Sequence, residues 1–318
     1  MDRLKILQTI ILLFVCGQVV SQSENQNTRQ LAITIDDPNT YVTPSLGWEE
    51  RNDRILKALE NYHIKSALFV CGMRVHDSIG ARLLKTWDER NHIICNHSYS
   101  HFYFNSNSKT SKVFINDFRK GDSLICHYNN YTKLFRFPFL KEGNTASKRD
   151  SMRAAMQVMG YKNGYVTIDA SDWFIDTKII EELKKSPQAD LTPYKEYYIE
   201  HIINRADYYD SLAKNIFNRK VKHTLLLHHS LLNALFLDDL LKALESNGWK
   251  LIDATEAYED SIFNFKPIIE PCGESLVWQC AKLDTAFSKG LRYPAEDSKY
   301  EELPLKQYIE EYRLRNEK

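Results

Sequence analysis

Residues 31–35 read Leu-Ala-Ile-Thr-Ile, and they run directly into Asp-Asp-Pro at residues 36–38. The apolar run predicts a short, buried β-strand. Successive side chains of a strand point to opposite sides, so Asp36 and Asp37 should face different surroundings. One carboxylate could therefore bind a metal while the other faces a substrate, although Asp-Asp-Pro also forms ordinary turns.

Six more strand-like runs follow along the chain, and apolar residues recur at helical spacing between them. The runs cover residues 65–70, 92–95, 133–137, 164–168, 223–228 and 249–252. Seven strands that alternate with helices predict a parallel sheet covered by helices, either an open doubly wound sheet or a barrel. In both architectures, functional groups gather where strands end and loops begin.

The composition is that of an ordinary globular protein. The 318 residues include 42 Lys+Arg and 42 Asp+Glu, so the formal net charge is zero, and 43% of the residues are hydrophobic. A neutral chain has no global field to attract nucleic acid or an anionic membrane, so we expect no nucleic-acid partner. The sequence contains no GxGxxG or P-loop motif, so it shows no nucleotide-binding site.

The beginning of the chain has the layout of a secretory signal peptide. Two basic residues precede an apolar run at 6–20, which is short for a membrane span of about 20 apolar residues. We therefore expect a signal peptide over residues 1–21, a polar linker over 22–30 and export of the protein. The alternatives are an uncleaved membrane anchor and a lipoprotein modified at Cys16.

Five cysteines remain after the predicted cleavage, and none of them forms a CxxC pair, so a structural zinc ribbon is not expected. Cys272 and Cys280 lie in a loop that contains Pro and Gly. They could form a small disulfide in an oxidising compartment, or both could stay free. We predict the disulfide.

Polar residues follow several other predicted strands. His97 and His101 are spaced i, i+4, and with a carboxylate from another strand they could form a catalytic two-His-one-carboxylate metal site. Arg136 can hold a carboxylate, Asp172 can orient a histidine, and His228 suits general acid catalysis. Each residue also has a simple structural explanation, but five such groups at five strand ends favour one common site.

The five segments, in this order, resemble those of the polysaccharide deacetylases, which form carbohydrate esterase family 4 (CE4) and share the chitooligosaccharide deacetylase homology domain. They are Thr-Ile-Asp-Asp-Pro (34–38), His-Ser-Tyr-Ser-His (97–101), Arg-Phe-Pro-Phe (136–139), Asp-Ala-Ser-Asp-Trp (169–173) and Leu-Leu-His (226–228). The resemblance implies a distorted (β/α) barrel of about seven parallel strands over residues 31–258. Residues 259–318 then form a C-terminal extension whose packing the sequence leaves open.

The resemblance also implies the chemical roles of the residues. One divalent metal, zinc before cobalt, nickel or manganese, would be held by Asp37, His97 and His101. Asp36 would be the general base paired with Arg136, and Asp172 would orient His228 as the general acid. Phe139 would supply its backbone N–H to the oxyanion, and Phe139, Trp173 and Leu227 would form an apolar slot for the acetyl methyl group.

The resemblance predicts a metal-dependent hydrolase that removes N- or O-linked acetyl groups from a carbohydrate and releases acetate. Chitooligosaccharide, peptidoglycan and acetylated xylan are the candidate substrates, and no obligate protein partner is evident. An inactive carbohydrate-binding protein and a hydrolase of another ester are the alternatives. Because Arg136 lies next to Asp36 in this scheme, we expect it to lower the pKa of that carboxyl.

Overall fold

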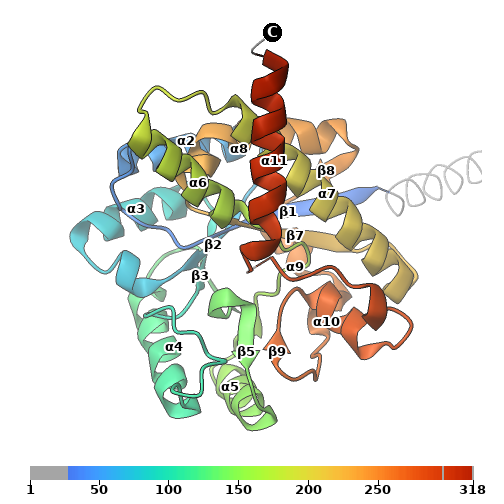
Figure 1. Cartoon of the computed structure of the whole chain (residues 1–318). Helices are drawn as coiled ribbons and strands as arrows, with labels where there is room; N and C mark the ends of the chain where they lie inside the picture. The colour runs from blue at the N-terminus through green and yellow to red at the C-terminus, as the bar shows by residue number, and fades with distance from the viewer. Residues whose placement is uncertain (1–27, 296, 317–318) are drawn as a thin grey trace, which may run out of the picture.

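A parallel β-sheet forms the centre of the molecule (Figure 1). The structure is a computed structural model that describes residues 28–295 and 297–316. Within these residues the main sheet has seven strands in the order β6-β4-β3-β2-β1-β7, with β8 also paired to β1. They are β1 (Arg29–Asp36), β2 (Ala67–Val70), β3 (Ile93–Asn96), β4 (Tyr131–Phe135), β6 (Lys162–Asn163), β7 (Lys222–His228) and β8 (Trp249–Leu251). All their pairings are parallel, as the sequence predicts.

The sheet is curled into a distorted barrel. Strands β2 and β3 are buried along their whole length, because helices cover a parallel sheet and exclude water from it. The chain after β6 crosses to the opposite edge of the sheet, where Ile168 makes a parallel bridge with Leu225 of β7. The predicted strand at 164–168 is thus reduced to this single bridge, because β6 ends at Asn163, just before the predicted run.

Helices surround the sheet, and their apolar faces form one core with it. The α-helices are α2 (Trp48–Asn61), α3 (Ser78–Glu89), α4 (Ser111–Ile125), α5 (Ala146–Val158), α6 (Asp172–Lys185), α7 (Thr192–Phe217), α8 (Leu231–Ser246), α9 (Ala254–Tyr258), α10 (Leu276–Leu283) and α11 (Lys299–Asn316). Short 3₁₀ turns are η1 (Gly72–Arg74), η2 (Pro138–Leu140), η3 (Ser261–Asn264) and η4 (Ser288–Gly290). None of the helices in the described part of the chain is long and apolar enough to cross a bilayer.

The register of the sheet brings the polar strand ends to one edge. Asp36 of β1 is aligned with His228 of β7, and Asn96 of β3 is aligned with Phe135 of β4. His97 and Arg136 directly follow these last two residues. Because the strands are parallel, the groups that follow them meet at the carboxyl edge of the sheet.

The C-terminal region packs onto the barrel. Strand β9 (Cys272–Gly273) forms a separate two-stranded antiparallel sheet with β5 (Lys141–Gly143). Leu276 of α10 and Leu305 of α11 are buried in the same core as the barrel helices. Residues 259–295 and 297–316 are therefore an integrated part of the fold in the structure.

The predicted disulfide between Cys272 and Cys280 is not formed, and both residues are free thiols. Cys272 is buried, and its thiol lies 3.7 Å from Oε1 of Gln279. Cys280 belongs to α10, which packs on the barrel core. The predicted signal peptide, residues 1–21, lies outside the described residues.

Candidate active site

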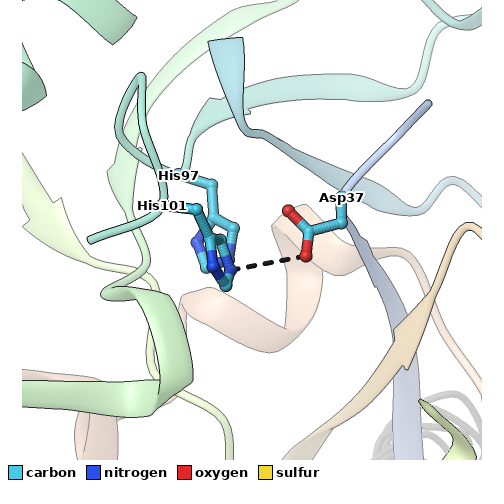
Figure 2. A group of neighbouring side chains, drawn as sticks. All are labelled: Asp37, His97 and His101. Atoms are coloured by element: carbon cyan, nitrogen blue, oxygen red, sulfur yellow. Dashed lines mark ion pairs between the residues drawn. The ribbon is translucent and has the colours of Figure 1, made fainter. Parts of the chain in front are cut away.

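Asp37, His97 and His101 form a cluster at the carboxyl edge of the sheet. Their side chains point toward one another in Figure 2, and one ligand atom from each lies within 4.8 Å of the others. The Nε2 atom of His101 is 3.4 Å from Oδ2 of Asp37. The structure thus brings together the three residues predicted as metal ligands.

The loop that carries the two histidines is held by buried hydrogen bonds. Nδ1 of His97 is 2.8 Å from the carbonyl oxygen of Arg136, so we infer that Nδ1 carries the proton and that Nε2 is free to bind a metal. Oδ1 of Asn96 accepts the backbone N–H of Ser98. The carboxylate of Asp117 accepts two more backbone N–H groups of the same loop.

Several residues around the cluster have left-handed backbone conformations, which are uncommon for residues other than glycine. They are Asp37 (φ 60°), Ser98 (φ 66°), His101 (φ 54°), Phe139 (φ 55°) and Leu140 (φ 56°). Such conformations cost roughly 1–3 kcal/mol each and are concentrated at functional sites. Their clustering supports a functional role for this edge of the sheet.

The protonation states of the cluster suit a divalent cation. Burial lowers the pKa of His97 to about 3 and also lowers that of His101, so both imidazoles are neutral at pH 7. Burial alone would raise the pKa of Asp37, but His101, His97 and Arg74 hold it below its usual value. Oδ1 of Asp37 is buried and has no hydrogen-bond partner within the described residues. A carboxylate with a free oxygen and two neutral imidazoles form a donor set that fits zinc and related ions.

Asp36 forms a buried ion pair with Arg136. Nη1 of Arg136 donates a hydrogen bond to Oδ1 of Asp36 at 2.5 Å, and the two side chains are 1% and 3% exposed. Arg136 also donates to Oγ1 of Thr34, to the carbonyl of Gly164 and to the hydroxyl of Tyr258. The guanidinium is therefore fixed by four different groups.

The expectation that Asp36 has a depressed pKa beside Arg136 is wrong, although Arg136 acts in that direction. Burial raises the pKa of this carboxyl to about 6, against the opposing effects of Arg136 and His228. The sequence identified the charge partner but not the depth of burial, and the loss of hydration exceeds the attraction of one guanidinium here.

His228 and Asp172 form a second hydrogen-bonded pair. Oδ1 of Asp172 is 2.8 Å from Nδ1 of His228, and Oδ2 accepts the backbone N–H of His228, also at 2.8 Å. Burial alone would lower the pKa of His228, but Asp172, Asp36 and Asp37 raise it to about 9. His228 therefore carries a proton at neutral pH and can act as a general acid.

His229 directly follows β7 and also borders the cavity, but its imidazole has a different partner. Its side chain is buried, and its Nε2 atom is 3.2 Å from Oδ1 of Asn52. Burial lowers the pKa of His229 to about 3. His228, and not His229, is therefore the histidine that is hydrogen-bonded to a carboxylate of the site.

The Asp172→Asn substitution should lower the pKa of His228, because it removes the carboxylate that contributes most to raising it. NMR titration of the metal-free protein should show the imidazole shifting from about 9 toward its ordinary value of 6.5. A general acid loses its proton as the pH rises through its pKa, so the alkaline limb of the rate profile should also move to lower pH. An unchanged titration would contradict the pairing.

A cavity of about 580 Å³ opens above these groups and is lined by Asp36, Asp37 and His228. Phe139 and Trp173 form part of its wall. Phe139 is 42% exposed, and the centroid of its ring lies 4.6 Å from that of His101. The volume is typical of a site for a small ligand.

Leu227, predicted as part of the apolar slot, is not in the cavity wall. It is fully buried in the main core, whereas its neighbour Leu226 lines the cavity. Side chains two apart on a strand share a face, so Leu226 lies on the same side as His228. The sequence interpretation chose the wrong face for this position.

Two residues of the site were not identified from the sequence. Nη2 of Arg74 lies 3.2 Å from Oδ2 of Asp37, and Arg74 follows β2 in the turn η1. Asn233 donates hydrogen bonds from Nδ2 to Oδ2 of Asp172 and to the carbonyl of His228. Arg74 could have been found as a polar residue after the second strand, whereas no local signal distinguishes Asn233.

Sequence comparison finds a known family that resembles the N-terminal half of this chain. The family model described as polysaccharide deacetylase matches residues 23–164. This match confirms the resemblance to the polysaccharide deacetylases of CE4 that the five motifs indicate. No curated protein matches the sequence.

Solved structures show the same fold. A mutant of BA3943, described as a CE4 family pseudoenzyme with restored enzymatic activity, is 20% identical over 74% of this chain and 69% of its own, with a TM-score of 0.51. The polysaccharide deacetylase Bc1974 from Bacillus cereus is 17% identical over 71% of this chain and 91% of its own, also with a TM-score of 0.51. The predicted (β/α) barrel of the CE4 type is therefore confirmed.

Proposed function

We propose that this protein is a metal-dependent hydrolase that removes N- or O-linked acetyl groups from a carbohydrate and releases acetate. One observation carries the proposal: the Asp37–His97–His101 cluster, the buried Asp36 and His228, which is hydrogen-bonded to Asp172, all lie on one cavity. This combination provides a metal-binding set, a base and an acid within one site.

The cluster would hold one divalent ion through Asp37, His97 and His101, with zinc expected before cobalt, nickel or manganese. Imidazole and carboxylate ligands accept all of these ions. When bound, such an ion polarises a carbonyl group and lowers the pKa of water. The neutral histidines and the ionised aspartate need no proton release before they bind it.

The protein's own groups would carry the proton transfers. Asp36 is placed to accept a proton from the water that attacks the acetyl carbon, and a pKa of about 6 leaves it ionised at neutral pH yet basic. The backbone N–H of Phe139 would donate a hydrogen bond to the oxyanion that forms. Phe139 has a positive φ of 55°, so its peptide groups are oriented differently from those of a regular 3₁₀ turn.

His228 would complete the reaction as the acid. Its Nδ1 atom is held by Asp172, so Nε2–H is the group available to the substrate. It would donate its proton to the sugar nitrogen or oxygen as the bond to the acetyl carbon breaks. The products are acetate and a free amine or hydroxyl on the sugar.

Chitooligosaccharide, peptidoglycan and acetylated xylan are the substrates to test, since each presents an acetyl group on a sugar ring. A cavity of about 580 Å³ is large enough for one substituted sugar unit. We further propose that the protein is exported, because the composition of residues 1–21 is that of a signal peptide.

Acetate release from these three substrates should depend on the metal. Chelation followed by dialysis should abolish release, and adding zinc back should restore it, because the cluster is the metal-binding set of the site. Acetate is measured enzymatically beside the metal content of each sample.

No acetate from any substrate with any restored metal would contradict the proposal and favour an inactive carbohydrate-binding protein. Turnover of a phosphate ester without acetate release would instead favour a hydrolase of another ester. Acetate release and phosphate-ester turnover are both measured on the same metal-stripped and metal-restored samples.

A further inference from the structure

Two parts of the C-terminal region touch the loops that supply Phe139 and Asp172. We call residues 272–276 the first arm and residues 293–295 with 297–301 the second arm. Both lie beyond residues 23–164, the part of the chain that matches the deacetylase family model. Figure 1 shows β9 of the first arm beside β5.

The first arm is hydrogen-bonded to the turn that contains Phe139. Strand β9 pairs with β5, which directly follows this turn. The backbone N–H of Glu274 donates a hydrogen bond to the carbonyl oxygen of Leu140 at 3.1 Å. The side chain of Glu274 forms an ion pair with Lys141. Three contacts from one arm therefore hold Leu140 of the turn and the strand β5 that follows it.

The turn needs such support because its conformation is strained. Phe139 and Leu140 both have positive φ, at 55° and 56°. Two bulky residues in succession rarely adopt this conformation, and it persists only where the surroundings impose it. The first arm supplies a partner for the carbonyl group of the second strained residue.

Gly273 brings the first arm into direct contact with the turn. Its φ is 131°, a region that favours glycine. A Cβ atom at this position would lie 2.2 Å from the carbonyl oxygen of Leu140 and 2.9 Å from Cα of Lys141. Any side chain here would have to displace the backbone next to Phe139.

The second arm is hydrogen-bonded to residues that precede and follow Asp172 in its loop. The backbone N–H of Ala295 donates to Oδ2 of Asp169 at 3.1 Å. The carbonyl oxygen of Ala295 accepts hydrogen bonds from Oγ of Ser171 at 3.0 Å and from Nε1 of Trp173 at 3.2 Å. The two residues that flank Asp172 are thus tied to the same carbonyl group.

A buried ion pair anchors the second arm to the barrel. Oε1 of Glu301 accepts a hydrogen bond from Nη2 of Arg205 at 2.9 Å, and the side chains are 3% and 0% exposed. Oγ of Ser171 is also 3.3 Å from Oε1 of Glu301. Nε2 of His201 accepts the backbone N–H of Ser171.

We propose that the C-terminal region completes the active site by positioning the Phe139 and Asp172 loops through its two arms. Gly273, Ala295 and Glu301 are positioning residues, since they touch the loops and not the substrate. This inference rests on the proposed function for its kinetic consequences. The placement of the loops themselves does not depend on which reaction is catalysed.

The Gly273→Ala substitution tests the first arm, with Gly290→Ala as the matched control. The control lies in the same region, and an added Cβ there meets no atom within 4 Å. In folded protein with full metal content, Gly273→Ala should lower kcat for acetate release by about 100-fold, because a misplacement of about 1 Å can have that effect. KM should change far less, and the control should match the wild type.

Hydrogen exchange gives a second readout that needs no activity. In Gly273→Ala, the backbone amides of residues 137–143 should exchange faster than in the wild type, and in Gly290→Ala they should not. Unchanged exchange in this segment, or a wild-type kcat, would overturn the role of the first arm. If the wild type itself releases no acetate, the proposed function fails, and the exchange experiment still decides the inference.

Ser171→Ala tests the second arm and serves if Gly273→Ala does not fold. This small substitution removes only the hydroxyl that contacts Ala295 and Glu301. It should lower kcat several-fold and speed the exchange of amides in residues 169–173, with KM and metal content unchanged. If Ser171→Ala loses thermal stability but keeps the wild-type kcat and amide exchange, the second arm only stabilises the fold, and the proposal is overturned.

Discussion

Asp37→Asn should abolish both metal binding and acetate release, whereas Asp36→Asn should keep the metal and lose about 10²–10⁴-fold in turnover. Asp37 belongs to the cluster with His97 and His101, but Asp36 is paired with Arg136. Removing a ligand empties the site, while removing a base affects only the proton transfer. Elemental analysis beside acetate release measures both effects in each variant.

Asp88→Asn is a matched control for these substitutions. Asp88 is also a mostly buried carboxylate, but it accepts hydrogen bonds from Asn129 and Asn130 away from the site. Its variant should retain both metal and turnover. Metal loss in Asp36→Asn with retention in Asp37→Asn would reverse the two assignments, and retention in both would locate the metal elsewhere.

Arg136→Met should lower the free energy of unfolding by about 3–5 kcal/mol, because it leaves Asp36 buried without its cationic partner. The same substitution removes hydrogen bonds to Thr34, Gly164 and Tyr258, which adds to the loss. Urea unfolding of the metal-free protein at pH 7 measures the change.

Two further variants distinguish the loss of the Asp36–Arg136 ion pair from the general effect of removing an arginine. Arg54→Met removes an exposed pair with Glu50 and should change the stability by less than about 1 kcal/mol. The double variant Asp36→Leu with Arg136→Met should recover much of the lost stability, since apolar replacement of both charges removes the unpaired group. It should still be inactive. A loss below about 1 kcal/mol in Arg136→Met alone would contradict the buried-pair interpretation.

Local patterns predicted most of the fold. The strands β1, β2, β3, β4, β7 and β8 all overlap the predicted runs, because a buried strand of a parallel sheet is apolar on both faces. The predicted strand at 164–168 was less accurate, since its pairing depends on how the sheet curls and not on its own composition.

The site was predicted through chain order and the family resemblance. In the structure seven of the ten named residues line one cavity, and Arg136 and Asp172 contact two of them, Asp36 and His228. Leu227 is the exception, because it directly precedes His228 on the strand and neighbouring side chains of a strand face opposite sides. Arg74 and Asn233 were missed because their roles depend on contacts with residues far away in sequence.

The amino-acid sequence by itself determined the alternation of strands and helices, the identity of the polar groups at the strand ends and the family they resemble. These are local properties of short segments. Only the tertiary structure decided the sign of the pKa shift at Asp36, the choice of His228 over His229 and the contact of the C-terminal arms with the active-site loops. Each of these depends on burial or on distances between segments that are remote in the chain, and hydration and contact energies are set by that assembled environment.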